Sequence, residues 1–256
     1  MSNPRTIVGV IPARLASVRL PRKPLRLICG YPMIAWVYAR ARAARELSDL
    51  LVATDSDEIL EWCRSLRIPA AMTSPAHRSG TERILEVVAR RVKEGTGADI
   101  YVNIQGDEPM VDIEHISLLI QPFLEDSSTQ VSTLKVRLEP AEAPAPDRVK
   151  VVTDSRGNAL YFSRNVLPYH RDAPPDAAYF KHLGFYAYSA AALERYRTLR
   201  PGPLEAAEHL EQLRFLENGV SIAVRETTKD TLSVDSEDDL RKVEQLFREA
   251  GLTFPG

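Results

Sequence analysis

Four basic side chains follow closely on an apolar segment near the start of the chain. They lie within ten positions of one another: Arg14, Arg19, Arg22 and Lys23. No acidic residue occurs before Glu46, so this charge has no local partner. Guanidinium and ammonium groups donate charge-assisted hydrogen bonds to phosphate and carboxylate oxygens. The stretch therefore indicates contact with an anionic partner, whereas charge alone would favour the plainer alternative of a solvated basic loop.

Phosphate-binding loops have several known forms, and two of them are absent here. The chain contains neither the GxGxxG pattern of dinucleotide-binding proteins nor the GxxxxGK[ST] pattern of P-loop proteins. The apolar run at 7–13 has the length and composition of a buried strand, which would deliver the basic loop to the edge of a sheet. There the loop would surround a triphosphate with Arg14, Ser17, Arg19 and Lys23.

Two acidic segments could hold a divalent cation near such phosphates. In QGDEP, at 105–109, Asp107 lies in a glycine-containing turn after an apolar strand. In VDSEDDL, Asp235 ends a strand, whereas the acids at 237–239 fit the first turn of a helix and its macrodipole. Carboxylate oxygens are preferred Mg²⁺ ligands, although a turn aspartate that bonds its own backbone is the ordinary alternative. Two carboxylates, Mg²⁺ and a basic loop together form a site for phosphoryl or nucleotidyl transfer.

The composition of the whole chain narrows the class of protein. Its 256 residues are 44% hydrophobic and 27% charged, with a formal net charge of −2, which suits a globular α/β protein. This balance argues against a nucleic-acid partner, because nucleic-acid-binding domains carry a broad basic face. Cys29 and Cys63 are too few for a disulfide framework or a four-cysteine zinc site. No apolar run reaches the roughly 18 residues of a membrane span, so we expect a cytoplasmic protein without membrane insertion.

A mitochondrial targeting segment is another interpretation of an arginine-rich, acid-poor start. However, the β-rich apolar run begins only a few residues into the chain. Prolines also interrupt the region, at Pro12, Pro21, Pro24 and Pro32. Because proline breaks helices, an amphipathic targeting helix cannot form across it, and we reject this interpretation.

Strands and helices alternate through the first half of the chain. Strands are predicted at 7–13, 50–55 and 99–109, and helices at 32–44 with Pro32 in first position, at 56–66 with a Ser56 cap, and at 79–92. This alternation predicts an α/β fold with a doubly wound, mostly parallel, Rossmann-like sheet. Ligands bind such sheets at the carboxyl ends of the strands. We therefore expect one shared edge for 12–23, 54–57 and 105–109.

The second half is richer in strands. These are predicted at 130–138, 148–154, 159–164, 182–189 and 221–226, with a hairpin turn at 154–158 and helices at 203–217 and 236–249, the last capped by Ser236. The proline- and alanine-rich stretch at 139–147 is predicted to be a surface loop. We expect one domain over 1–256, with a core at 1–130, a smaller inserted β-rich region at about 131–200 and a return to the core at about 201–256.

A series of motifs spans nearly the whole chain in a recognisable order. They are VIPARxASxRLPxKPL, GxPMI, VATD, SGTER, VNIQGDEPM, VKVV, ALYFSR, HLGFYAY, PLExxExLEQLR and VDSEDDL. With them the chain resembles the 3-deoxy-manno-octulosonate (Kdo) cytidylyltransferases from about residue 7 to 245. HLGFYAY together with LEQLR distinguishes this family from other sugar-acid cytidylyltransferases.

The resemblance implies a nucleotide-diphospho-sugar transferase fold and a Mg²⁺-dependent reaction, CTP + Kdo → CMP-Kdo + pyrophosphate, in lipopolysaccharide synthesis. It also implies a homodimer built on the β-rich region, which would bind the sugar. A cytidylyltransferase for a related sugar acid such as 8-amino-Kdo stays open. A nucleotide-binding regulatory protein is the non-enzymatic alternative, but binding alone needs no second metal carboxylate.

The resemblance also assigns residues to tasks. CTP would be bound by Ala13, Arg14, Ser17, Arg19, Lys23, Arg78, Ser79, Gly80 and Asp107. The sugar acid would be bound by Gln105, Arg164, His182, Tyr186, Glu211 and Gln212. Asp107 and Asp235 would ligate Mg²⁺ and would act in catalysis with Arg14 and Lys23.

Several of these residues have plain structural alternatives. His182 would equally serve as a satisfied buried histidine, and Glu208 as a helix-surface acid. On a helix over 203–217, Glu208 would share one face with Glu211 and Gln212. Arg22 departs from the family pattern, which has glycine there. Losing glycine removes easy access to positive φ, so the shape of the loop and the role of Arg22 stay open.

Overall fold

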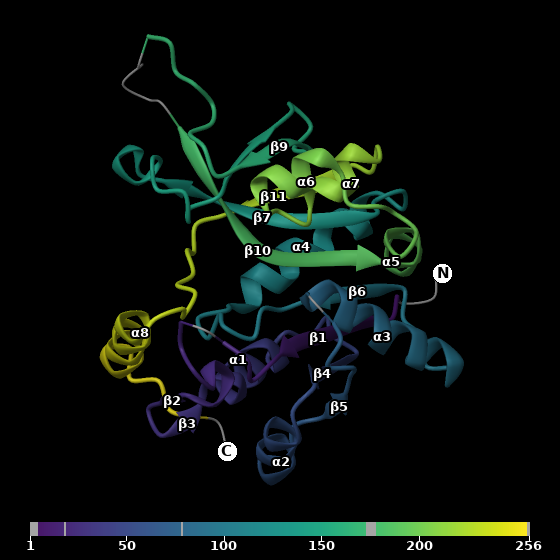
Figure 1. The fold of residues 1–256 in the computed structure, drawn as a ribbon, viewed down its shortest axis with the longest axis vertical. Helices are drawn as coiled ribbons and strands as arrows, with labels where there is room; N and C mark the ends of the chain where they lie inside the picture. Colours follow the sequence, from purple (N-terminus) through teal and green to yellow (C-terminus); the bar gives the residue numbers. More distant parts are fainter. Residues whose placement is uncertain (1–4, 18, 78, 173–177, 255–256) are drawn as a thin grey trace. The chain divides into compact units, whose positions relative to one another are not determined.

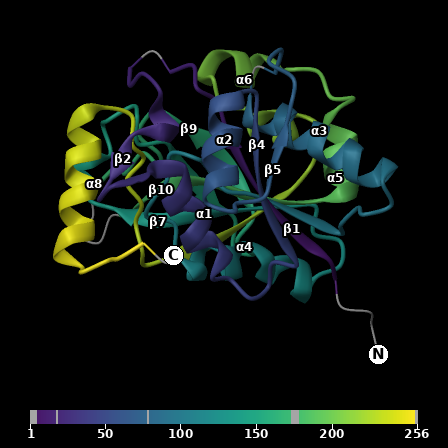
Figure 2. The same ribbon diagram turned by 90° about the horizontal axis from the view of Figure 1, so that it is seen from below.

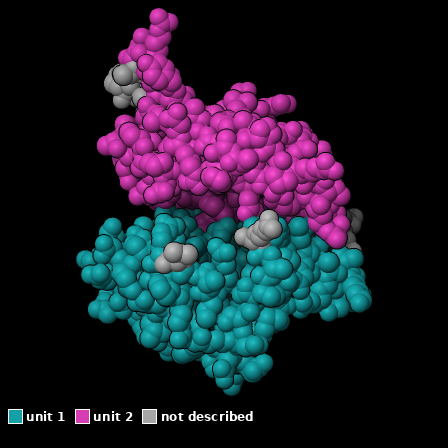
Figure 3. Space-filling model, viewed as in Figure 1, with its two compact units in different colours: residues 1–116, 231–256 teal, residues 117–230 magenta. Residues whose placement is uncertain are grey.

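The computed structural model describes residues 5–17, 19–77, 79–172 and 178–254. The chain forms two compact units, coloured separately in Figure 3. Unit 1 combines residues 1–116 with 231–256, and unit 2 comprises residues 117–230. Unit 2 is thus inserted in the sequence of unit 1. The single domain with bounds near 130 and 200 stays a prediction.

Unit 1 is built on four parallel strands. Their order is β6 (Ile100–Asn103), β1 (Ile7–Ala13), β4 (Asp49–Thr54) and β5 (Ala70–Met72). All residues of β1 except Pro12 are buried, as befits a central parallel strand that is covered on both faces. Because the strands run in the same direction, the segments that follow β1, β4 and β6 lie at one edge, as predicted.

Helices cover both faces of this sheet. Figure 2 shows α1 (Met33–Arg42) and α2 (Asp57–Ser65) on one side of β4 and β5, and α3 (Gly80–Lys93) on the other. Right-handed crossover connections produce this arrangement. The predicted doubly wound, mostly parallel α/β fold is therefore confirmed.

Serine caps fix the start of several helices. Ser56 caps α2, Ser79 caps α3 and Ser236 caps α8 (Glu237–Glu249), and each side chain accepts a hydrogen bond from the backbone N–H three residues further on. Each cap contributes about 1 kcal/mol. The caps predicted at Ser56 and Ser236 are confirmed. Pro32 lies at the N-cap of α1, one position before the place predicted for it.

A buried apolar cluster joins the N-terminal loop of unit 1 to its C-terminal helix. Its members are Leu20, Ile28, Met33, Trp36, Val234, Leu240, Val243 and Phe247. The rings of Trp36 and Phe247 pack edge to face, with centroids 4.9 Å apart. Each fully buried side chain of this size contributes roughly 1.5–3 kcal/mol. The cluster holds α8 beside the small ladder of β2 (Leu27–Ile28) and β3 (Tyr31–Pro32), as Figure 1 shows.

Unit 2 has a mixed sheet. β7 (Val131–Leu138) pairs with β10 (Tyr179–Ser189) in antiparallel fashion and with β11 (Ile222–Thr227) in parallel fashion. The hairpin of β8 (Lys150–Thr153) and β9 (Ala159–Ser163) joins through β8 to β10, and its turn at 154–158 is as predicted. The helices are α4 (Ile113–Glu125), which begins in unit 1, α5 (Ala190–Tyr196), α6 (Pro203–Glu208) and α7 (Leu213–Glu217).

The predicted continuous helix at 203–217 is wrong. It is broken at His209, which adopts the left-handed conformation with φ 53° between α6 and α7. A two-pronged ion pair spans the break, since Arg214 Nη2 and Nε lie 2.5 and 2.7 Å from the two carboxylate oxygens of Glu205. This pair stabilises the bent arrangement, which helical periodicity does not reveal. Glu208, Glu211 and Gln212 consequently do not share one helix face.

Other differences are smaller. The strand predicted at 99–109 ends at Asn103, and the strand expected to end at Asp235 is wrong, because residues 231–235 are irregular. The predictions also omitted α4, α5 and the short strands β2, β3 and β5. Within the described ranges, no helix combines enough length and apolar character to cross a membrane.

Candidate active site

Four predicted site residues of unit 1 lie in one group. The Lys23 ammonium lies 2.7 Å from Asp107 Oδ2 and 2.8 Å from Asp235 Oδ1. Arg19 Nη2 pairs with the other oxygen of Asp235 at 3.0 Å. The two carboxylates lie far apart in the sequence, so the fold brings them together.

Backbone contacts place these side chains. The N–H of Val234 donates to the carbonyl oxygen of Asp107 at 2.9 Å, which holds the two acidic segments together. A Cβ on Gly106 would lie 2.6 Å from the carbonyl oxygen of Pro12. Only glycine therefore allows the QGDEP turn to approach the end of β1 this closely. Lys23 begins the short 3₁₀ helix η1 (Lys23–Leu25) that follows the basic loop.

The electrostatics of this group favour the charged form of Lys23. Burial by itself lowers the pKa of Lys23, but the carboxylates of Asp107 and then Asp235 outweigh burial and raise that pKa above 10.5. Lys23 is therefore charged at neutral pH. Its side chain is 16% exposed, so the charges interact in a medium less screened than bulk water.

The same carboxylates fit a divalent cation. Asp107 and Asp235 already direct oxygens toward one shared positive charge. In the part of the chain that the structure describes, no third His, Cys, Asp or Glu joins them in a metal-binding group. Mg²⁺ commonly keeps water and substrate phosphate oxygens and uses only one or two protein carboxylates. The donor set therefore suits Mg²⁺ with a nucleotide better than a closed protein cage.

The basic loop presents further predicted residues. Ala13 is the buried last residue of β1, and the exposed Arg14 follows it directly. Ser17 Oγ accepts a hydrogen bond from the N–H of Leu20 at 3.4 Å, which ties the loop to the apolar cluster. The Arg19 side chain is 68% exposed. Arg14 and Arg19 are thus accessible to an anionic ligand.

Arg22 keeps the conformation that glycine favours. Its φ of 59° and ψ of 31° lie in the left-handed region, at the N-cap of η1. For a residue with a side chain this conformation costs roughly 1–2 kcal/mol. Its guanidinium pairs with Glu58 of α2. The loop shape is therefore retained without glycine, and Arg22 serves an ion pair with α2.

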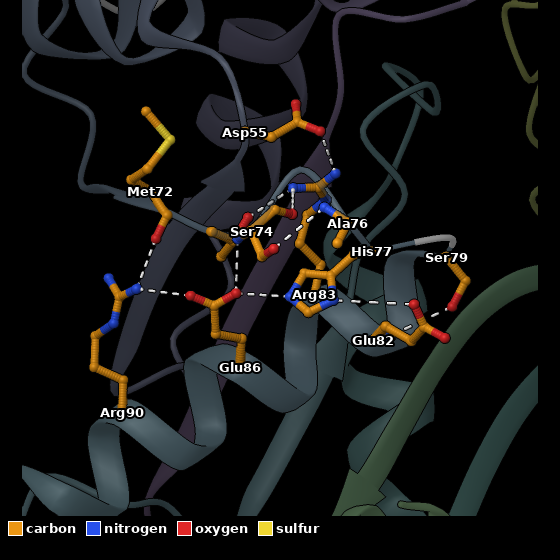
Figure 4. Close-up of polar contacts among 11 residues, drawn as sticks. Asp55, Met72, Ser74, Ala76, His77, Ser79, Glu82, Arg83, Glu86 and Arg90 are labelled. Carbon is orange, nitrogen blue, oxygen red and sulfur yellow. Dashed lines mark hydrogen bonds and ion pairs between the residues drawn. The ribbon is translucent and has the colours of Figure 1, made fainter.

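The N-terminus of α3 adjoins the same edge. Ser79 caps the helix and Gly80 is its first residue. A Cβ on Gly80 would lie 3.4 Å from the ring of Pro12, which places this helix terminus beside the end of β1. Arg78 lies outside the described residues. Figure 4 shows Ser79 with the polar network that surrounds the loop before α3.

In unit 2, a bulge brings His182 and Tyr186 together. The register of β10 against β7 shifts between Leu183 and Tyr186: Leu183 lies opposite Leu134, and Tyr186 lies opposite the adjacent residue, Thr133. Side chains four residues apart on a regular strand are separated by about 13 Å. Here the Nε2 atom of His182 lies 2.9 Å from the Oη atom of Tyr186. Bulges of this kind often re-aim side chains at functional sites.

Thr133 of β7 fills the bulge. Its Oγ1 lies 3.0 Å from Nε2 of His182 and donates to the carbonyl oxygen of Phe185 at 2.7 Å. Desolvation, helped by the charge of Lys181, lowers the pKa of His182 from 6.5 to about 3. Burial raises the pKa of Tyr186 well above 10. Both side chains are neutral at physiological pH, which suits hydrogen bonding to hydroxyl groups.

Arg164 is fixed from several sides. Its Nε donates to the carbonyl oxygen of Glu208 at 2.9 Å, and Nη1 donates to that of Pro146 at 3.2 Å. The Glu208 carboxylate accepts from the N–H of Arg164 at 2.9 Å and from the hydroxyl of Ser163 at 2.5 Å. Buried Lys150 donates to the carbonyl oxygen of Arg164 at 2.6 Å. Glu208 is therefore an anchor for Arg164, and not a plain surface acid.

The remaining residues predicted to bind the sugar acid lie in different parts of the chain. Gln212 is buried directly before α7, and across the described ranges its Nε2 has no hydrogen-bond partner. A ligand acceptor would satisfy it. Glu211 beside it is exposed. Gln105 belongs to unit 1, two residues before Asp107, whereas the other five belong to unit 2. The ligand contacts of all six residues stay predictions.

Sequence reasoning missed two supporting residues of unit 2. Lys150 and Thr133 lie inside predicted strands, and a lysine within the apolar run RVKVV was the available signal for the first. Nothing in the sequence indicates Thr133, because its role depends on the bulge in a distant strand.

The fold and the converging groups of unit 1 define a class of protein. A mostly parallel sheet carries a basic loop and two carboxylates at one edge, which is the architecture of an α/β nucleotidyltransferase. The model of the cytidylyltransferase family matches residues 8–222.

Individual relatives are more specific. A 3-deoxy-manno-octulosonate cytidylyltransferase of Acidobacterium capsulatum is 52% identical over 243 residues, which are 95% of this chain and 97% of that protein. A protein of the same name from Koribacter versatilis is 50% identical over 241 residues, 94% of this chain and 90% of its own. The solved structure of a CMP:2-keto-3-deoxy-manno-octonic acid synthetase complexed with CTP matches with a TM-score of 0.91 and 41% identity, covering 96% and 99% of the two chains. The chain belongs to the 3-deoxy-manno-octulosonate cytidylyltransferase family, and the predicted resemblance is confirmed.

Proposed function

We propose that this enzyme transfers the cytidylyl group of CTP to Kdo and releases pyrophosphate, in the cytoplasm and as a homodimer, to supply lipopolysaccharide synthesis. The observation that carries the proposal is the convergence of Lys23, Asp107 and Asp235 beside an accessible basic loop. The names and high identity of the relatives support the choice of CTP and Kdo.

Unit 1 would handle the charge of the nucleotide. Arg14 and Arg19 neutralise phosphate oxygens, and the charged Lys23 donates hydrogen bonds to them. Cations held in place before the reaction stabilise the negative charge that develops on departing pyrophosphate. Asp107 and Asp235 are the residues that would hold Mg²⁺. When bound, Mg²⁺ reduces the charge of the phosphates and polarises the attacking hydroxyl.

Unit 2 would orient the sugar acid. Arg164 suits the carboxylate because its guanidinium is already fixed in direction by two carbonyl oxygens. Neutral His182 and Tyr186 would hydrogen-bond to hydroxyl groups. The anomeric hydroxyl then attacks the α-phosphorus of CTP in line, and pyrophosphate leaves. Fixing both reactants in this way supplies much of the catalysis.

A panel of sugar acids tests the substrate. The wild-type enzyme is given CTP and MgCl₂ with Kdo, 8-amino-Kdo or N-acetylneuraminate, and pyrophosphate release is followed. We expect the highest kcat/KM with Kdo and a rate near background with N-acetylneuraminate. A higher kcat/KM with 8-amino-Kdo would assign the enzyme to that substrate instead. Equal rates with N-acetylneuraminate would overturn the proposal.

A further inference from the structure

The segment 73–77 lies between β5 and α3 and is fixed mainly by side chains. Its first residue, Thr73, donates its N–H to the carbonyl oxygen of Thr54 at the end of β4. Beyond this point, polar side chains along one face of α3 reach back to the segment, as Figure 4 shows. They include Arg83, Glu86 and Arg90, which lie at helical spacing. The conformation of 73–77 therefore depends on the helix that comes after it.

Arg83 is the most buried of these groups. Its side chain is 3% exposed, and it ties three segments together. One nitrogen, Nη2, pairs with Asp55 after β4 at 2.6 Å, and Nη1 donates to Oγ1 of Thr73 at 2.7 Å and to the carbonyl oxygen of Ser74 at 3.5 Å. The planar fork of a guanidinium can serve these acceptors simultaneously, whereas a lysine ammonium cannot match the same geometry.

Glu86 provides a second anchor one turn further along α3. Its Oε2 accepts from the N–H of Ser74 at 2.7 Å and lies 2.6 Å from Nε2 of His77. Arg90 bonds to its Oε1 at 3.0 Å and to the carbonyl oxygen of Met72 at 2.7 Å. Desolvation tends to raise the pKa of Glu86, but the hydrogen bonds from Ser74 and His77 lower it overall. The carboxylate is thus ionised while it holds the segment.

The held segment ends beside the phosphate-binding edge. Ser79 and Gly80 form the start of α3 beyond it, and Gly80 adjoins the ring of Pro12. The carbonyl oxygen of Pro12 in turn adjoins Gly106, next to Asp107. The N-terminus of α3, which comes after the 73–77 segment, therefore lies at the edge that carries the converging charges of unit 1. A shift of the segment would displace Ser79 and Gly80 from that edge.

We infer that Arg83, through its pair with Asp55, is a positioning residue for nucleotide binding: it sets the conformation of 73–77 and so the placement of Ser79 and Gly80 against the nucleotide. This inference rests on the proposed function. It predicts an effect on CTP affinity and not on the chemical step, because Arg83 is buried behind the segment and acts through it.

The chain contains a matched control. Arg91, on the same helix, pairs with Asp49 at 2.7 Å. Asp49 begins β4, whereas Asp55 follows its end. Both pairs thus connect α3 to β4, one at the site edge and the other at the opposite end of the strand. Asp55→Asn and Asp49→Asn make the same chemical change at these two places.

The experiment measures the Kd of CTP by calorimetry and the KM for CTP from pyrophosphate release, on folded wild-type, Asp55→Asn and Asp49→Asn enzymes. We expect Asp55→Asn to raise both constants by about tenfold with kcat within about threefold, since small displacements of positioning groups are costly. Asp49→Asn should leave both within about twofold. Thr73→Val, which removes one acceptor of Arg83 but keeps the ion pair, should give an intermediate rise and serves if Asp55→Asn does not fold.

The outcomes separate the two proposals. If wild-type protein binds no CTP, the proposed function fails and this inference fails with it. If wild-type protein binds CTP but Asp55→Asn and Thr73→Val bind it equally well, only the inference is overturned. It is likewise overturned if Asp49→Asn weakens binding as much as Asp55→Asn, because the effect would then reflect general loosening of α3.

Discussion

The predicted ligand-binding residues of the two units differ in charge: several of those in unit 1 form ion pairs, whereas His182 and Tyr186 of unit 2 are neutral. In unit 1, Lys23 forms ion pairs with both Asp107 and Asp235, and this group is partly exposed. In unit 2, burial keeps His182 and Tyr186 neutral in a hydrogen-bonded network. A triphosphate with a metal ion requires strong, adaptable charge, whereas sugar hydroxyls require donors and acceptors at fixed places. The contrast fits the division of labour proposed for the two substrates.

The units also differ in how they position these groups. Unit 1 places them on loops that follow parallel strands, where many α/β enzymes bind ligands. Unit 2 depends on irregular features, namely the bulge in β10 and the broken helix at His209. Arg164 and Glu211 are the charged residues of unit 2 that are predicted to contact the sugar acid. Of these, Arg164 is held by Glu208. The following variants test whether the two units act on different substrates in this way.

The largest effect is expected at the charged group of unit 1. Asp107→Asn keeps the size of the side chain but removes half of the carboxylate pair, and turnover should fall by at least about a hundredfold, the typical cost of losing one group that stabilises developing charge. The assay is pyrophosphate release at saturating CTP and Kdo. Asp112→Asn, in the segment that follows QGDEP, retains side-chain capping ability and should keep near-normal turnover. Near-normal turnover in Asp107→Asn would remove this residue from the site.

An effect on the other substrate is expected in unit 2. Glu208→Gln cannot accept from both Ser163 and Arg164 as the carboxylate does, so Arg164 should lose its orientation. We expect the KM for Kdo to rise about tenfold, the cost of one hydrogen bond to a charged group, with the KM for CTP unchanged.

The control for that variant is Glu205→Gln in the same short helix. Glu205 pairs with Arg214 and not with Arg164, so its loss should lower the melting temperature while both KM values stay near wild type. If Glu208→Gln changed the KM for CTP and Kdo alike, the proposed separation of the two units would be wrong.

The fold and the candidate site were predictable to different degrees. Strands and capped helices of unit 1 follow from local signals, such as Ser56 before an acidic first turn. The break at His209 could not be predicted, because a non-glycine residue in the left-handed conformation is stabilised by the pair between Glu205 and Arg214. The meeting of His182 with Tyr186 depends on strand register, which a single strand does not encode. The motifs thus predicted which residues belong to the site, but not the contacts that hold those residues in place.

His182 should make the free energy of unfolding depend on pH. Its pKa is about 3 in the folded protein and 6.5 when unfolded, so the unfolded chain binds more protons between these values. His182 therefore contributes stability that is present above pH 6.5 and is lost as the pH falls toward 3. In urea unfolding, His182→Asn should reduce the slope of the unfolding free energy with pH in this window by up to about 1.4 kcal/mol per pH unit. An unchanged slope in His182→Asn would show that this imidazole is not kept neutral in the folded protein.

The smallest effect is expected at Arg22. Glycine there would relieve a left-handed conformation that costs roughly 1–2 kcal/mol, but it would lose an exposed ion pair with Glu58 worth about 0–1 kcal/mol and increase the entropy of the unfolded chain. Arg22→Gly should therefore change the unfolding free energy by less than about 1 kcal/mol and leave the KM for CTP unchanged. A large rise in that KM would instead make Arg22 a phosphate contact.

Pyrophosphate release by the wild-type enzyme, measured with CTP, Kdo and Mg²⁺ together and with each left out in turn, tests the central claim most directly. We expect rapid release when all three are present and a rate near background when any one is absent. Release that persists at the full rate without Kdo or without Mg²⁺ would contradict the proposed transfer reaction.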